Sequence, residues 1–98
     1  MNNIHSTAIV SSKAELGNNI YIGPYCIINE NVKINDNCKF LANVYMEGNT
    51  TVGANCTFYP FSTIGTKPQD LKYKGEKSEL MIGKNNTIRE HVTINPGT

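Results

Sequence analysis

The sequence has no tryptophan, only three cysteines and two histidines, and a formal net charge of only +1. No apolar segment approaches the roughly 20 residues that cross a membrane. The opening MNNIHSTAIV lacks the positive and apolar regions of a signal peptide. The near-neutral charge gives no reason to expect nucleic acid or an anionic membrane as partner. We therefore expect one domain, or part of one, that is cytoplasmic, binds no nucleic acid and does not insert into membranes.

What the sequence does contain is a repeat of six residues. Every sixth residue from Ile4 to Ile64 is apolar over eleven consecutive steps, and the series resumes at Ile82. The apolar positions are Ile4, Val10, Leu16, Ile22, Ile28, Ile34, Phe40, Met46, Val52, Phe58, Ile64, Ile82, Ile88 and Ile94. The residue two before each step is mostly small or β-branched, and residues two apart lie on the same face of a strand. Each hexad therefore predicts a short strand with one large and one small inward side chain.

The third residue after the apolar step indicates a turn. It is asparagine in seven of the fourteen hexads, at Asn19, Asn31, Asn37, Asn43, Asn49, Asn55 and Asn85. Asparagine tolerates left-handed backbone angles better than most residues. A strand and a corner every six residues close a triangle after 18 residues, and stacked coils pair in parallel about 4.8 Å apart.

These features predict an all-β parallel β-helix of triangular section. We take the left-handed sense from its resemblance to hexapeptide-repeat proteins, because right-handed crossovers are the usual rule. An antiparallel sandwich is the alternative, but it predicts period-two alternation with turns every eight to twelve residues.

The coil also assigns the cysteines and histidines. Cys38 and Cys56 are 18 residues apart and should stack in adjacent coils, as core-filling thiols rather than as a redox or metal pair. With Cys26 they show no CxxC spacing, so no disulfide framework or metal site is expected. His5 is expected to be solvated. His91 occupies a corner position, where a turn residue is favoured over a general base.

The repeat is interrupted between Ile64 and Ile82. Its next apolar steps would fall on Asp70 and Glu76, and carboxylates cannot enter a narrow apolar core without a large desolvation cost. We therefore expect about twelve residues to leave the coil as an excursion loop near residues 66–79, so that Ile82 pairs with Val52. Loops on rigid scaffolds often carry function.

The segments IHSTAIV, IGPYCII, FSTIGTKPQDLKYKGE and IGKNNTIREHVTINPGT resemble the N-terminal part of the UDP-N-acetylglucosamine acyltransferase family. The resemblance runs over essentially the whole chain, and its most specific part is QDLKY.GE followed by IG.NN.IRE.VTI..GT. It implies transfer of an (R)-3-hydroxyacyl group from acyl carrier protein to the glucosamine 3-hydroxyl of UDP-N-acetylglucosamine, the first step of lipid A biosynthesis. It also implies a homotrimer with active sites between subunits, and no cofactor.

The resemblance assigns substrate-binding residues to the excursion. The family's loop aspartate, which contacts the glucosamine, falls on Asp70, and its loop lysine falls on Lys72; Gln69 belongs to the same motif. A carboxylate suits sugar hydroxyls, and an ammonium suits a phosphate or carbonyl oxygen. The chain departs from the family at Asn95, where many members have histidine.

The family's catalytic histidine lies in a later coil, and neither histidine here matches it. We therefore expect residues 1–98 to be the N-terminal hexapeptide-repeat part of such an enzyme, without the later coils and C-terminal helical domain, and inactive alone. Two alternatives remain: another hexapeptide-repeat acyl- or acetyltransferase, or a non-catalytic β-helix.

Overall fold

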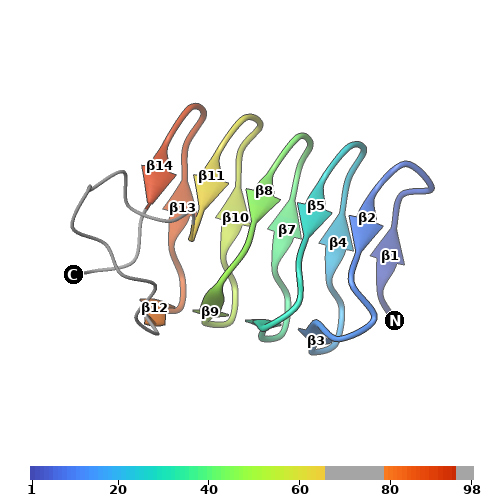
Figure 1. Cartoon of the computed structure of the whole chain (residues 1–98), viewed down its shortest axis with the longest axis horizontal. Helices are drawn as coiled ribbons and strands as arrows, with labels where there is room; N and C mark the ends of the chain where they lie inside the picture. Colours follow the sequence, from blue (N-terminus) through green and yellow to red (C-terminus); the bar gives the residue numbers. More distant parts are fainter. Residues whose placement is uncertain (66–78, 95–98) are drawn as a thin grey trace.

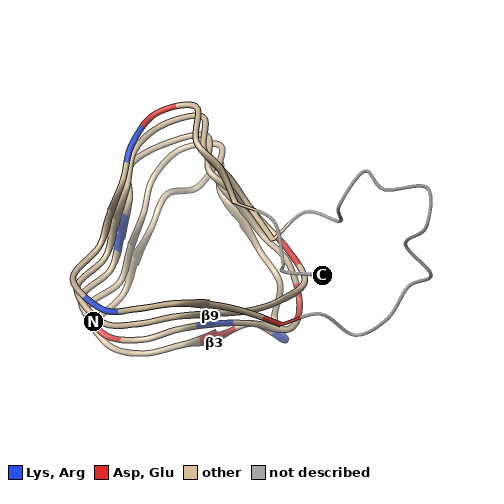
Figure 2. Ribbon diagram, turned by 90° about the vertical axis from the view of Figure 1, so that its left-hand side faces the viewer, with Lys and Arg blue, Asp and Glu red and all other residues tan. Residues whose placement is uncertain are grey.

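The computed structural model of the chain describes residues 1–65 and 79–94. These residues wind into a left-handed parallel β-helix (Figure 1), whose cross-section is a triangle (Figure 2). Every strand pairing among them is parallel and joins one coil to the next, which excludes the antiparallel sandwich. The predicted fold class is confirmed. No helix in the described ranges is long and apolar enough to cross a membrane.

The three sides of the triangle are three parallel sheets, here called sheets A, B and C. Sheet A consists of β1 (Asn3–Ile4), β4 (Tyr21–Ile22), β7 (Lys39–Phe40), β10 (Thr57–Phe58) and β13 (Thr87–Ile88). Sheet B consists of β2 (Ile9–Val10), β5 (Ile27–Ile28), β8 (Tyr45–Met46), β11 (Thr63–Ile64) and β14 (Thr93–Ile94). Sheet C consists of β3 (Glu15–Leu16), β6 (Val32–Ile34), β9 (Asn49–Val52) and β12 (Glu79–Ile82).

The core is the column of inward side chains that the hexad predicts. Each middle coil buries a large residue and, two positions earlier, a smaller one, as with Phe40 and Cys38 or Ile64 and Ser62. Identical positions stack from coil to coil, and the rings of Phe40 and Phe58 lie parallel with centroids 4.6 Å apart. The narrow prism is therefore filled by ladders of like side chains.

The register of the strands shows where extra residues enter the solenoid. In the early coils paired residues are 18 apart, as with Ile34 and Val52. Later, Val52 pairs with Ile82 and Ile64 with Ile94, each 30 apart. Twelve additional residues therefore separate β11 from β12, and the predicted pairing of Ile82 with Val52 is confirmed.

The corners use left-handed backbone angles, largely as predicted. Six of the seven corner asparagines have positive φ. Asn49 does not: it lies within β9, and Gly48 takes the turn instead with φ of 76°. The physical reason is that glycine adopts this conformation without steric cost, so the turn falls one residue earlier. The prediction was wrong at this corner.

Candidate functional site

The predicted substrate-binding residues Gln69, Asp70 and Lys72 lie outside the residues that the structure describes. The structure does define the two strands that flank them. On one side, β11 pairs with β8 and the Gly65 N–H donates to the Ile94 carbonyl at 2.7 Å. On the other side, β12 pairs with β9 along four residues. The candidate site can therefore be described from the corner between sheets B and C, to which these strands belong.

Two glycines shape this corner. Gly65 has φ of 80°, and a Cβ built on it would lie 2.1 Å from the Glu47 carbonyl oxygen and 2.6 Å from Thr50 Oγ1. A Cβ on Gly48 would lie 3.0 Å from the Gly65 carbonyl oxygen. The buried Thr50 hydroxyl fixes the same turn by donating to the Glu47 carbonyl at 2.9 Å. The corner that precedes residue 66 is therefore so closely packed that only glycine fits at Gly65.

A polar network lies beside the Gly65 corner, on the outer side of sheet B. The Tyr45 hydroxyl donates to Glu47 Oε1 at 2.6 Å, and Asn29 Nδ2 donates to the Tyr45 oxygen at 3.2 Å. The hydrogen bond to the Glu47 carboxylate, with a smaller contribution from burial, raises the pKa of Tyr45. The network holds a carboxylate one coil below the point where the chain leaves β11.

A shallow groove continues from this network along the same corner toward the N-terminus. Its volume is about 680 Å³, and it is lined by Lys13, Glu30, Glu47 and Gly48 among others. Lys13 Nζ and Glu30 Oε2 are 3.8 Å apart across it, and both side chains are exposed. An exposed pair of this kind contributes little to stability, so the groove is a polar, solvated surface.

Neither histidine lies at this corner. His91 has φ of 60° at the corner between sheets A and B, where its ring stacks on Phe61 with centroids 5.5 Å apart, which confirms the prediction of a turn residue. His5 is exposed, as predicted, and its Nδ1 lies 2.9 Å from Thr7 Oγ1. The described residues therefore bring no imidazole to the corner between sheets B and C.

The cysteines are core residues, as the coil predicts. Cys38 and Cys56 occupy equivalent positions in adjacent coils, and their thiols donate to the carbonyls of Gly53 and Gly83 at 3.2 and 3.1 Å. All three cysteines are free and buried, and burial raises the pKa of Cys26 and Cys38. Among the described residues no three His, Cys, Asp or Glu side chains are grouped to hold a metal ion.

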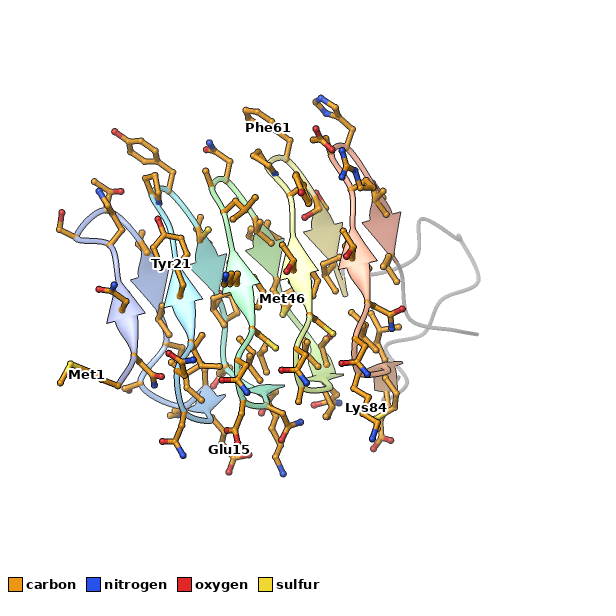
Figure 3. The ribbon with its side chains drawn as sticks, turned by 180° about the vertical axis from the view of Figure 1, so that it is seen from behind. Met1, Glu15, Tyr21, Met46, Phe61 and Lys84 are labelled. Carbon is orange, nitrogen blue, oxygen red and sulfur yellow. The ribbon has the colours of Figure 1, made fainter. Side chains whose placement is uncertain are left out.

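The sequence reasoning missed two aromatic corner residues. Tyr25 and Phe61 have φ of 59° and 67° and are 64% and 56% exposed. Phe61 projects outward from its corner (Figure 3). Both stand three residues after an apolar step, the position that is asparagine in seven other hexads. The same count would have identified them. The Tyr45–Glu47 contact had no such signal, because outward positions carry no period.

Solved structures of similar sequence share this fold closely. A crystal structure of UDP-N-acetylglucosamine acyltransferase is 51% identical with a TM-score of 0.95, covering 98% of this chain and 37% of its own. The enzyme from Bacteroides fragilis is 46% identical with a TM-score of 0.92, covering 97% and 37%. The Arabidopsis enzyme is 32% identical with a TM-score of 0.72, covering 96% and 41%.

Curated relatives agree with these structures. The acyl-[acyl-carrier-protein]–UDP-N-acetylglucosamine O-acyltransferase of Thermodesulfovibrio yellowstonii is 57% identical over 94 residues, which are 96% of this chain and 36% of that protein. The protein of the same name from Rickettsia peacockii is 50% identical over 96 residues, again 36% of its length. The chain thus spans about a third of the length of these relatives.

The sequence profile described as bacterial transferase hexapeptide (six repeats) matches residues 13–47 and 31–66, which together are more than half of the chain. This match falls on the coils whose inward ladders and left-handed corners are described above. The chain belongs to the bacterial transferase hexapeptide family.

Proposed function

We propose that these residues form the N-terminal coils of an acyltransferase that moves an (R)-3-hydroxyacyl group from acyl carrier protein to the 3-hydroxyl of UDP-N-acetylglucosamine, the first step of lipid A biosynthesis. The observation that carries the proposal is the 57% identity over 94 residues to a relative named for this transfer. We propose further that the enzyme is cytoplasmic and works as a homotrimer with active sites between subunits.

The reaction is direct acyl transfer without an enzyme-bound intermediate. The sugar oxygen attacks the thioester carbonyl, a C–O bond forms, the C–S bond breaks, and the carrier thiol leaves. The hydroxyl proton passes through a general base to the departing sulfur, and donors stabilise the developing oxyanion. The family resemblance gives the base role to a histidine in a later coil, so none of the described residues is assigned to it.

Within this scheme the inserted segment holds the sugar nucleotide. Asp70 accepts hydrogen bonds from glucosamine hydroxyls, Lys72 donates to a phosphate or carbonyl oxygen, and Gln69 supplies an amide to the same site. The close packing around Gly65 supports this proposal, because it fixes the point at which the inserted segment starts. Binding energy of this kind is effective only when the contact groups are held in position.

The proposal can be tested in a chimaera in which this chain replaces the aligned segment of the Thermodesulfovibrio yellowstonii relative. Losing one charge-assisted hydrogen bond costs about 1.5–3 kcal/mol. Asp70→Asn and Lys72→Gln should therefore lower kcat/KM for UDP-N-acetylglucosamine about 10- to 100-fold. Glu79→Gln and Lys84→Gln make the same charge changes at exposed positions that the motif does not specify, and they should leave kcat/KM unchanged. An equal kcat/KM in all four variants would contradict the sugar-nucleotide-binding role of Asp70 and Lys72.

The alternative function is that of another hexapeptide-repeat acyl- or acetyltransferase. It would transfer an acyl or acetyl group to a different amine or hydroxyl. Acceptor specificity separates the two: the proposed enzyme should acylate UDP-N-acetylglucosamine on oxygen, whereas the competitor should leave that sugar nucleotide unmodified and acylate another amine or hydroxyl.

A further inference from the structure

A cavity of about 370 Å³ lies at the corner between sheets C and A, near the first coil of the β-helix. Three neighbouring parts of the chain line it. They are residues 1–3, the corner asparagines Asn19 and Asn37, and the outward side chains of β4 and β7, Tyr21 and Lys39. We call it the sheet A cavity.

Hydrogen bonds from one side chain fix the N-terminal wall of this cavity. Asn2 Nδ2 donates to the Gly17 carbonyl at 3.0 Å, and Asn2 Oδ1 accepts from the Ile20 N–H at 2.8 Å. Strand β1 then pairs with β4, which places Asn3 beside Tyr21 in register. Figure 3 shows Tyr21 near this end of the β-helix. The wall therefore has a defined position against the second coil.

The polar groups of the cavity can both donate and accept hydrogen bonds. Asn3, Tyr21 and Lys39 stand in one outward column of sheet A, about 4.8 Å apart. Beside this column Asn19 Nδ2 donates to Asn37 Oδ1 at 2.9 Å, which orients both corner amides. That bond uses one hydrogen and one oxygen, so Asn19 keeps its Oδ1 acceptor and Asn37 keeps its Nδ2 donors. Hydroxyl groups, which also donate and accept, suit such a surface.

The charge of the lining is positive. Lys39 is exposed, and none of the described residues that line the cavity is an Asp or a Glu. The ion pairs within the described parts of the chain involve Lys13 and Arg89 rather than Lys39. Asp36 belongs to the same corner but does not line the cavity, and its Oδ1 accepts the Asn18 N–H at 2.8 Å. The Lys39 ammonium therefore favours an anionic group, for which phosphate is a common partner.

The Tyr21 ring and the size of the cavity narrow the class of ligand. Tyr21 is 37% exposed, so part of its ring faces the cavity between Asn3 and Lys39. A flat aromatic ring can pack against the apolar face of a sugar ring. Small-molecule sites have volumes of about 300–1,000 Å³, and this cavity is near the lower limit. It therefore suits one sugar ring rather than a sugar nucleotide.

We propose that the sheet A cavity binds a monosaccharide that carries a phosphate. Lys39 pairs with the phosphate, the amides of Asn19 and Asn37 exchange hydrogen bonds with the hydroxyls, and the Tyr21 ring packs against the sugar. Binding makes and breaks no covalent bond. The site is independent of the proposed acyl transfer, because it uses neither the inserted segment nor the corner between sheets B and C.

The test is titration of the 98-residue chain with glucose 6-phosphate, followed by ¹H–¹⁵N NMR, with circular dichroism as the check on folding. The side-chain amides of Asn19 and Asn37 report directly on the cavity. Their signals should shift with a Kd of about 1 mM or tighter. Glucose lacks the phosphate and inorganic phosphate lacks the sugar, so each should bind about 10-fold more weakly or worse.

Variants at exposed positions separate the groups that carry the binding. Lys39→Gln removes the ammonium and should weaken binding of glucose 6-phosphate about 10-fold or more. Tyr21→Ala removes the ring and should weaken it about 3- to 10-fold. Lys33→Gln makes the same charge change on sheet C, outside the lining, and should leave the Kd unchanged. Lys72→Gln changes the inserted segment and should also leave it unchanged.

Each outcome supports or overturns the site. Corner amide signals that do not move with glucose 6-phosphate overturn it, as does equal weakening by Lys39→Gln and Lys33→Gln. Inorganic phosphate that binds as tightly as glucose 6-phosphate overturns it too. Loss of binding in Lys72→Gln but not in Lys39→Gln assigns the ligand to the inserted segment and overturns the cavity. Selective loss in Lys39→Gln and Tyr21→Ala supports the site, whether or not the chimaera transfers acyl groups.

Discussion

Gly65 provides the sharpest test of how closely the corner between sheets B and C is packed. Gly65→Ala places a methyl group in a left-handed conformation, which costs an L-residue about 1–2 kcal/mol. Its Cβ would also lie 2.1 Å from the Glu47 carbonyl oxygen, and that backbone atom cannot move independently of its coil. Overpacking of this kind costs about 1–3 kcal/mol. The free energy of unfolding should therefore fall by about 2–5 kcal/mol, a large part of the total for a chain of this size.

Two other glycines provide matched controls. Gly48→Ala shares the positive φ, but its nearest atom would be 3.0 Å away, so it should lose only about 1–2 kcal/mol. Gly83→Ala has ordinary backbone angles and 3.6 Å of clearance to Asn86, so it should be neutral or stabilising by up to about 1 kcal/mol. Urea unfolding followed by circular dichroism measures all three, and at a slope of about 1–3 kcal/mol/M the differences are resolvable. A Gly65→Ala loss no larger than that of Gly83→Ala would refute the close packing described here.

Three further predictions follow from the described residues. The raised pKa of Tyr45 means that the hydrogen bond of its hydroxyl contributes fully to stability below the ordinary tyrosine pKa of about 10, and that this contribution is lost as pH rises through the higher pKa of the folded state. Glu47→Gln should therefore shift the titration of Tyr45, followed by ultraviolet absorbance, to lower pH. A titration that does not move would contradict the contact. Cys26, Cys38 and Cys56 should react with a thiol reagent only as fast as the chain unfolds, whereas rapid labelling of the folded chain would contradict their core role. Residues 1–98 alone should show no acyl transfer, since no histidine here matches the catalytic one, and measurable turnover would disprove this.

The inward half of the fold could be predicted because it obeys a single period. Six-residue spacing assigns Ile22, Phe40 and Phe58 to one ladder, and a carboxylate at a core position reveals the interruption at Asp70. The corner rule failed at Asn49, where a neighbouring glycine took the turn. Glycine and asparagine compete for the same backbone conformation, and spacing alone does not rank them.

The outer surface was harder to predict for a physical reason. Outward side chains meet partners in their own coil or in the next one, and packing does not constrain their identity. The Tyr45–Glu47 pair and the stack of Phe61 on His91 therefore became apparent only in three dimensions. The candidate site residues Gln69, Asp70 and Lys72 came from family resemblance rather than from period, and their roles remain proposals.

The most direct measurement of the central claim is acyl transfer by the chimaera, with UDP-N-acetylglucosamine and (R)-3-hydroxyacyl-acyl carrier protein as substrates and mass spectrometry of the product. The account predicts an O-acylated sugar nucleotide, with turnover lowered by Asp70→Asn and not by Glu79→Gln. A folded, assembled chimaera that forms no such product, while the parent enzyme does, would contradict it.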